Sequence, residues 1–245
     1  LNLENGDKLF DTPFSRGEIG IPINGLVWMG SFDEMNKRIE DKLSEGFRCV
    51  KLKIGAIDFD SEMTLIKSIR KRYSKSAIEL RVDANGGFTA GDAMSRLEEL
   101  SKYDIHSIEQ PIRQKQWHEM SYLCANTPVP IALDEELIGV NIPKMKDDLL
   151  DFIKPQYIVL KPTLHGGMKG TREWIEKSRE RNVDSWITSA LESSVGLSAI
   201  AQLTSDIYGN DITMAQGLGT GALFADNLPS QTEIRGDKIW MTGKK

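Results

Sequence analysis

The sequence predicts a (β/α)₈ barrel, and three observations support that fold class. Its 245 residues are close to the size of one such barrel. Short apolar runs rich in Val and Ile alternate with longer amphipathic stretches, as in strand-helix units around a parallel sheet. The residues at the ends of these runs recur every 25 to 30 positions, close to one barrel unit, at Lys53, Asp83, Glu109, Asp134, Lys161, Thr188 and Ala215.

Eight strands are expected, and each helix between them should begin at a capping residue. The helix starts predicted most clearly follow Ser31, which has Glu34 three residues on, Asp58 and Thr89. Gly46 is a typical residue just beyond a helix end. No Pro-rich tract or Gly/Ser linker interrupts the alternation. The strands are expected at 22–29, 48–54, 78–83, 105–109, 129–133, 156–161, 184–188 and 211–215.

Composition excludes several classes of function. The net charge of −5 comes from interspersed acids and bases, which argues against nucleic acid as a partner. Since no apolar run approaches about 20 residues, we expect no membrane role. Cys49 and Cys124 form neither a disulfide framework nor a zinc pattern. We therefore expect buried thiols and, because no secretion signal is recognisable, a cytoplasmic location.

Three successive predicted strands end in a carboxylate: Asp83, Glu109 and Asp134. A carboxylate at the end of a buried strand is costly unless it is paired or bound to metal. Neighbouring strands lie about 5 Å apart, so three such groups can share one hard cation. Any one acid alone is better explained by a charged partner or a helix cap, but three in register favour Mg²⁺, with Mn²⁺ as the alternative.

Lysines flank these acids on both sides. Strand alternation places Lys51 and Lys53 on one face of the second strand, and Lys161 ends the sixth strand across the barrel. Mutual repulsion and a nearby cation should lower an amine pKa enough for one lysine to act as a general base. A buried lysine could instead simply neutralise the carboxylates.

These motifs, taken together, resemble the muconate-lactonizing subgroup of the enolase superfamily. The resemblance covers about residues 20 to 225 and rests on the K-x-K strand, D-A-N, E-Q-P, D-E and the sixth-strand lysine, in that order. It implies an enolase C-terminal-domain-like barrel in which Mg²⁺ binds both oxygens of a substrate carboxylate. A lysine then removes the proton from the adjacent carbon.

Within that subgroup, residues 161–167 (KPTLHGG), 187–194 and 217–221 resemble the o-succinylbenzoate synthases. This resemblance implies a lyase of menaquinone biosynthesis, which dehydrates 2-succinyl-6-hydroxy-2,4-cyclohexadiene-1-carboxylate to 2-succinylbenzoate through an enediolate. Lys53 would take the proton and return it to the departing hydroxyl on the same face. Lys161 would support the enediolate from the opposite face, and Lys51 would orient or acidify Lys53.

Further contacts to a small carboxylate substrate are expected at the strand ends. Arg81 and Asn85 flank Asp83, and the loops after the last two strands contribute Ser189, Gly219 and Thr220.

Several other residues are expected to stay outside the site. His165 is predicted to face solvent in its loop, and Glu135 to point away from Asp134 if the strand continues. Trp28 and Trp186 are predicted to be barrel core.

Two other functions remain open from the residues alone. Dipeptide epimerases of the L-Ala-D/L-Glu type share the metal and lysine motifs, and a catalytically silent metal-binding barrel would serve as a scaffold. The resemblance also implies an N-terminal capping domain. We expect residues 1–20 to be its end and linker, 21–225 the barrel, and 226–245 a segment that packs against it.

Overall fold

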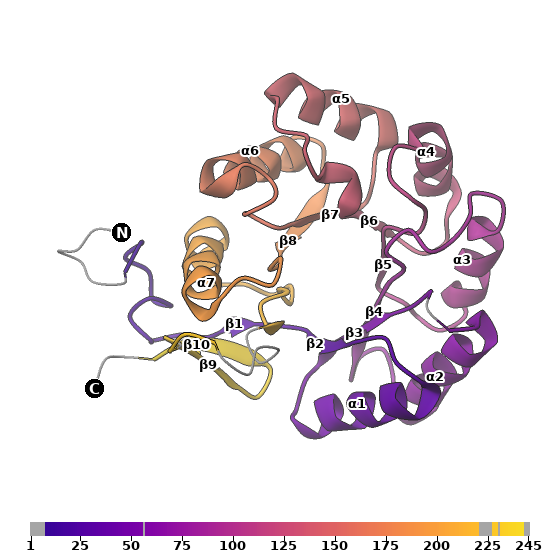
Figure 1. The fold of residues 1–245 in the computed structure, drawn as a ribbon, viewed down its shortest axis with the longest axis horizontal. Coiled ribbons are helices and arrows are strands. Elements are labelled where there is room, and N and C mark those ends of the chain that lie inside the picture. Colours follow the sequence, from indigo (N-terminus) through magenta and orange to yellow (C-terminus); the bar gives the residue numbers. More distant parts are fainter. Residues whose placement is uncertain (1–7, 56, 221–226, 230, 243–245) are drawn as a thin grey trace.

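The computed structural model describes residues 8–55, 57–220, 227–229 and 231–242. Its centre is a seven-stranded parallel sheet in which each strand pairs with the next along the chain. The sheet curls, and the helices lie on its outer side (Figure 1). The strands are β2 (Gly25–Val27), β3 (Cys49–Lys53), β4 (Glu79–Asp83), β5 (Ser107–Glu109), β6 (Ile131–Leu133), β7 (Tyr157–Leu160) and β8 (Asp184–Ile187).

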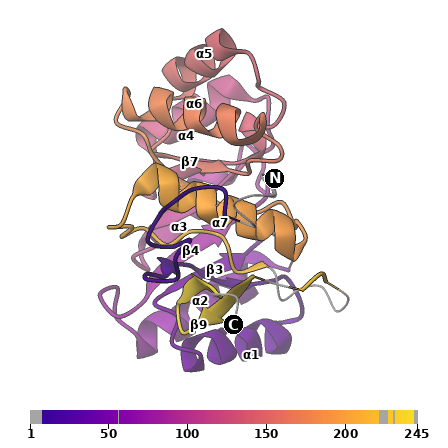
Figure 2. The same cartoon turned by 90° about the vertical axis from the view of Figure 1, so that its left-hand side faces the viewer.

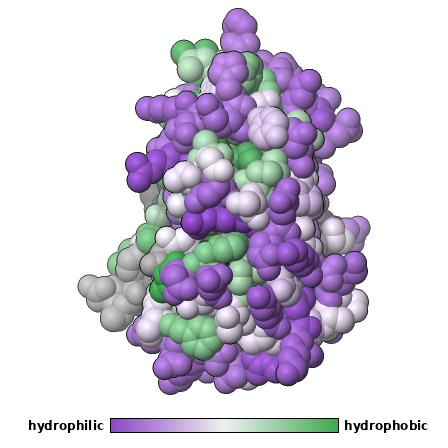
Figure 3. Space-filling model, turned by 90° about the vertical axis from the view of Figure 1, so that its right-hand side faces the viewer, coloured by the Kyte–Doolittle hydropathy of each residue, from purple (hydrophilic) through white to green (hydrophobic). Residues whose placement is uncertain are grey.

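Of the seven helices in the described chain, six connect successive strands of this sheet and the seventh follows the last strand, as expected for parallel strand-helix units. They are α1 (Phe32–Ser44), α2 (Phe59–Arg72), α3 (Ala93–Ser101), α4 (Trp117–Asn126), α5 (Pro143–Ile153), α6 (Gly167–Arg179) and α7 (Ser194–Tyr208). Hydrophilic residues cover most of the molecular face shown in Figure 3, with apolar residues scattered among them.

The predicted eighth strand at 211–215 is wrong in position and length. Instead, Gln216 forms a parallel bridge with Ile23, and Gly217 forms one with Thr188, so this short segment joins the two edges of the curled sheet. The apolar run that suggested a strand lies just before the pairing residues. Gly217 passes so close to Thr188 that an added Cβ would lie 2.2 Å from its Oγ1, which explains the glycine.

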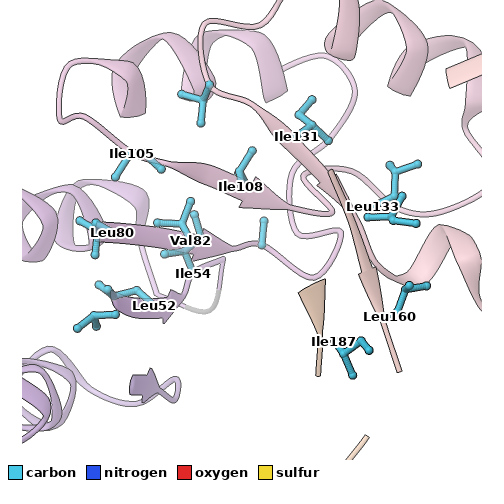
Figure 4. Packing of buried hydrophobic residues seen from close by; sticks show 14 of the residues in the cluster. Leu52, Ile54, Leu80, Val82, Ile105, Ile108, Ile131, Leu133, Leu160 and Ile187 are labelled. Atoms are coloured by element: carbon cyan, nitrogen blue, oxygen red, sulfur yellow. The ribbon is translucent and has the colours of Figure 1, made fainter. Parts of the chain in front are cut away.

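Two hydrophobic clusters hold the sheet and helices together. The larger one fills the space between the sheet and the helices, with Leu52, Val82, Ile108 and Leu160 among its residues (Figure 4). Because side chains alternate along a strand, the residues next to these face the inside of the curl. There a smaller cluster contains Ala132, Val159 and Trp186. The core prediction for Trp186 is thus confirmed.

Helix caps follow the sequence in two cases and depart from it in one. Ser31 and Glu34 form the predicted capping box, and Asp58 accepts a hydrogen bond from Ser61 N at 2.9 Å. Thr89, however, is not a cap, because α3 begins four residues later at Ala93. The Thr89 and Asp92 side chains each accept the other's backbone N–H, at 3.2 and 2.8 Å, and this turn delays the helix.

A small antiparallel sheet lies beside α7 and the first described residues (Figures 1 and 2). Its strands are β1 (Ile21–Pro22), β10 (Lys238–Met241) and β9 (Thr232–Arg235), in that order. It therefore ties the last described residues to the segment that enters the parallel sheet. The expected division into 1–20, 21–225 and 226–245 stays a prediction, and residues 1–7, 221–226, 230 and 243–245 lie outside the described chain. Among the described helices, none is long and apolar enough to span a bilayer.

Candidate active site

The carboxyl ends of neighbouring strands bring the predicted site residues side by side. In the register of β3, β4 and β5, Lys53 pairs with Asp83, and Asp83 pairs with Glu109. Asp134 directly follows β6, and Lys161 directly follows β7. Because the strands are parallel, all these carboxyl ends lie at the same end of the curled sheet, as the sequence predicted.

Lys51 joins two of the three acids from below the strand ends. Its Nζ lies 2.7 Å from Oε2 of Glu109 and 3.1 Å from Oδ2 of Asp83. The two carboxylate side chains are 0% and 1% exposed, and the lysine side chain is 12% exposed. Lys51 therefore forms a buried ionic bridge between the ends of β4 and β5.

Lys53 is held at the rim by a relay of polar groups. Its Nζ donates to Oδ2 of Asp83 at 2.9 Å and to Oδ1 of Asn85 at 2.7 Å. Asn85 in turn donates to Oε1 of Glu135 at 2.9 Å. The prediction that Glu135 points away is wrong, because β6 ends at Leu133 and the chain enters the 3₁₀ turn η1 (Glu135–Leu137), where strand alternation no longer applies.

Lys161 approaches the acids from β7. Its Nζ lies 2.5 Å from Oδ2 of Asp134, whose side chain is 2% exposed. Lys53 and Lys161 thus bond different acids, and the strands between them carry the third, Glu109. The two amines lie on either side of the row of carboxylates.

Burial and charge act in opposite directions on these groups. Burial raises the pKa of Glu109 to about 7, and the neighbouring charge of Lys51 only partly offsets it. Burial also raises the pKa of Asp134, and the charge of Lys161 only partly offsets this effect. At Asp83, burial raises the pKa, but the charges of Lys51 and Lys53 outweigh it, so the net pKa is lowered.

The expectation of a lowered amine pKa is not met at two of the lysines. Burial lowers the pKa of Lys51, but the charges of Glu109 and Asp83 raise it by more. The pKa of Lys161 follows the same pattern, with Asp134 as the dominant charge. The carboxylates outweigh repulsion between the amines, so both lysines are stabilised as cations.

The chemistry of the three acids suits a hard divalent cation. Glu109 Oε1 and Asp134 Oδ1 are buried without a hydrogen-bond partner, a costly arrangement that a cation would relieve. Within the described ranges, however, no three His, Cys, Asp or Glu side chains form a ready-made metal site. Lysine amines contact one oxygen of each acid, so binding a cation requires these side chains to rearrange.

The residues predicted to contact substrate lie in different places in the structure. Arg81 lies inside the curl with no exposure, where its guanidinium contacts Glu79 and Ala215 O and stacks 4.4 Å from the Trp186 ring. A substrate contact at Arg81 is therefore not supported. It lies two residues before Asp83 on β4, which places it one layer deeper than the rim. Asn85, in contrast, lies at the rim, bonded to Lys53.

The remaining residues predicted to contact substrate lie together near β2. Ser189 and Thr220 hydroxyls are hydrogen-bonded to each other, and both residues are buried. Gly219 and Thr220 line a hollow of about 600 Å³ together with Trp28. The prediction that Trp28 is barrel core is wrong, because Trp28 lines this hollow. Trp28 is half-buried, and Lys53 Nζ lies 5.5 Å from the centroid of its ring. Because Trp28 directly follows β2, its position at a strand end was the sequence feature that could have placed it at the site.

His165 contradicts its prediction as a solvent-facing loop residue. It has no exposure, and its Nδ1 accepts the backbone N–H of Lys161 at 2.9 Å. Burial, followed by the charges of Lys161 and Lys146, lowers its pKa to about 3. The loop folds back on Lys161 through a further hydrogen bond from His165 N to Lys161 O at 3.1 Å, which the Gly-flanked sequence did not reveal.

Comparison with known proteins agrees with this arrangement. The model of the Enolase C-terminal domain-like family matches residues 34–236. The chain belongs to this family. It is 55% identical over 238 residues to an o-succinylbenzoate synthase of Desulfotalea psychrophila, which covers 96% of this chain and 64% of the relative.

The solved structures give the same picture. The crystal structure of MenC from Desulfotalea psychrophila LSv54 superposes with a TM-score of 0.89 at 51% identity, covering 97% of this chain and 65% of that one. An L-Ala-D/L-Glu epimerase of Bacillus subtilis is 28% identical over 71% of this chain and 47% of the relative. The chain thus spans less than two thirds of the length of these relatives.

Proposed function

We propose that this chain carries the active site of a magnesium-dependent o-succinylbenzoate synthase. The observation that carries the proposal is the row of three strand-end carboxylates between Lys53 and Lys161. Such a site suits removal of a proton next to a carboxylate, since amines can reach the substrate from both sides. The 55% identity to the Desulfotalea psychrophila synthase supports this substrate above others.

Magnesium, bound by Asp83, Glu109 and Asp134, would neutralise charge that develops on the substrate's carboxylate. Lys53 takes the proton from the ring carbon that bears this carboxylate. The C–O bond at the neighbouring ring carbon then breaks, and Lys53 returns the proton to the departing hydroxyl, which leaves as water. The ring becomes aromatic, and no oxidant is needed.

The contacts of the lysines fit these roles. Asp83 and Asn85 fix the position of the Lys53 amine at the rim, where it can act on one face of the substrate. Lys161 retains its positive charge through Asp134 and stabilises negative charge from the other side. Lys51 lies deeper, bonded to two acids, and it shares Asp83 with Lys53, so it fixes the carboxylate that holds the Lys53 amine.

A dipeptide epimerase is the second candidate, because one lysine on each face also suits racemisation. The more distant relatives do not distinguish the two activities, because the Bacillus subtilis epimerase and the Bacillus subtilis o-succinylbenzoate synthase are each 28% identical to this chain. The 55% relative is what favours the synthase. A silent scaffold is disfavoured, since all three acids and all three lysines are present.

The deciding experiment is to incubate the complete protein with Mg²⁺ and each substrate in turn. The proposal expects loss of the diene absorbance of the cyclohexadiene substrate, and no comparable racemisation of L-Ala-L-Glu. Racemisation without dehydration would establish the epimerase instead. Inactivity on both would favour the scaffold. A small-molecule substrate and a cytoplasmic location stay predictions.

A further inference from the structure

Gln110 joins the ends of three neighbouring strands although it lies outside the row of acids. It follows Glu109, has no exposure and adopts a left-handed backbone with φ 37°, which a glutamine rarely does. Its backbone N–H donates to Ala132 O at 2.9 Å, and its carbonyl accepts from Gly86 N at 2.7 Å. The strained conformation therefore connects β5 to β6 and to the loop after β4.

The Gln110 side chain extends this connection to Asp134. Its Oε1 accepts the backbone N–H groups of Asp134 and Glu136, each at 3.2 Å. Its Nε2 donates to Ile112 O at 2.9 Å and to Oε2 of Glu136 at 3.3 Å. All four of its contacts are internal, so the amide has one defined orientation, with oxygen toward η1.

Glu136 holds the other side of this network. The residue is 5% exposed, and its Oε1 accepts from Lys115 N at 2.8 Å and from Trp117 Nε1 at 2.9 Å. Both carboxylate oxygens of Glu136 are thus hydrogen-bonded. Because buried networks with every member satisfied have one arrangement, Gln110 and Glu136 act as a rigid unit.

We infer that Gln110 and Glu136 are positioning residues that fix the spacing between Glu109 and Asp134 for a divalent cation. Glu109 directly precedes Gln110, and the backbone of Asp134 is hydrogen-bonded to the Gln110 side chain. Asp134 follows the last residue of β6, so its backbone N–H bonds to the Gln110 side chain and not to a neighbouring strand. The inference rests on the proposed function, since it assigns the supports of the proposed metal ligands.

The test reverses the hydrogen-bond polarity of the pair. In Gln110→Glu, the new carboxylate can still accept from Asp134 N and Glu136 N but has no hydrogen for Oε2 of Glu136 or for Ile112 O. In the double variant Gln110→Glu/Glu136→Gln, the amide on position 136 supplies that hydrogen, while its oxygen still accepts from Lys115 N and Trp117. Gln114→Glu, the same change at an exposed site four residues away, is the matched control.

Two quantities are measured on the complete protein: the Mg²⁺ dissociation constant by calorimetry, and the urea midpoint in EDTA. We expect Gln110→Glu to weaken Mg²⁺ binding about 10- to 100-fold, as mutation of the residues that support metal ligands typically does. The double variant should bind Mg²⁺ more tightly than Gln110→Glu, because it restores the hydrogen bond between positions 110 and 136 while the bond to Ile112 O stays lost. Gln114→Glu should bind like the unsubstituted protein. The urea midpoint identifies any variant that is merely unfolded.

Three results would overturn the inference. Unchanged Mg²⁺ affinity in a folded Gln110→Glu variant would show that the network does not support the ligands. A double variant that binds no better than Gln110→Glu would show that the pairing is irrelevant. Absence of Mg²⁺ binding by the unsubstituted protein would overturn the proposed metal site first, and this inference with it.

Discussion

The amine of Lys51 lies 2.7 Å from Oε2 of Glu109, and neither side chain has more than 12% exposure. The same amine also reaches Asp83, so one cation compensates two buried anions. Removing one member of such an arrangement leaves uncompensated buried charge, which is more costly than losing a surface ion pair. The site is therefore part of the stability of the fold as well as its chemistry.

Lys51→Met should lower the free energy of unfolding by about 3 to 5 kcal/mol, measured by urea denaturation in EDTA. Lys144→Met removes an exposed i,i+4 pair with Asp148 and should cost less than about 1 kcal/mol. Equal effects of the two substitutions would contradict the structural role of Lys51.

Mg²⁺ should raise the thermal midpoint of the protein, because a ligand that binds only the folded state stabilises it. At about one hundred times the dissociation constant, the gain is about 2.7 kcal/mol. Asp134→Asn should reduce this gain strongly, since it removes a proposed ligand. Asp148→Asn, an exposed acid on α5, should leave it intact. If Asp134→Asn responds to Mg²⁺ like the unsubstituted protein, Asp134 is not a ligand.

His165 should make stability depend on pH. Its folded pKa is lowered to about 3 from 6.5, so the unfolded chain binds a proton first as the pH falls. The stabilisation is present above about pH 6.5 and is lost toward pH 3, with about 2 kcal/mol lost between pH 7 and pH 5. His165→Gln should flatten this dependence in urea titrations at the two pH values. The exposed His118→Gln should not, and identical slopes in both variants would disprove the assignment.

Arg81→Met tests whether Arg81 is core rather than a substrate contact. Because its guanidinium is fully buried against Glu79 and Trp186, the substitution should lower the free energy of unfolding by about 3 kcal/mol or more. Arg72→Met, at an exposed pair with Glu40, should cost less than about 1 kcal/mol. Unchanged stability in Arg81→Met, with a large rise in KM, would restore the substrate contact.

Much of the site could be predicted from the sequence because it depends on strand ends. Lys53, Asp83 and Glu109 lie in register since each ends a short buried strand, and one βα unit separates successive strands. Lys161 was found by the same spacing. The eighth strand was predicted in the wrong place because pairing there involves only Gln216 and Gly217, too few residues to create a pattern.

What could not be predicted lies where the backbone leaves regular structure. Strand alternation assigns a direction to Glu135 only if β6 continues, but the chain turns at Asp134. His165 looked exposed because glycines flank it, whereas its ring folds back onto the Lys161 amide. The Gln110 network joins residues 26 positions apart through side chains, and the E-Q-P triplet was its only signal.

In the proposed dehydration, Lys53 moves the proton. The direct measurement is the rate at which Lys53→Ala, in the complete protein at saturating Mg²⁺, removes the diene absorbance of the cyclohexadiene substrate. We predict a loss in kcat of at least about a hundredfold, the usual lower range for a general acid-base residue. A kcat near that of the unsubstituted protein would contradict the account.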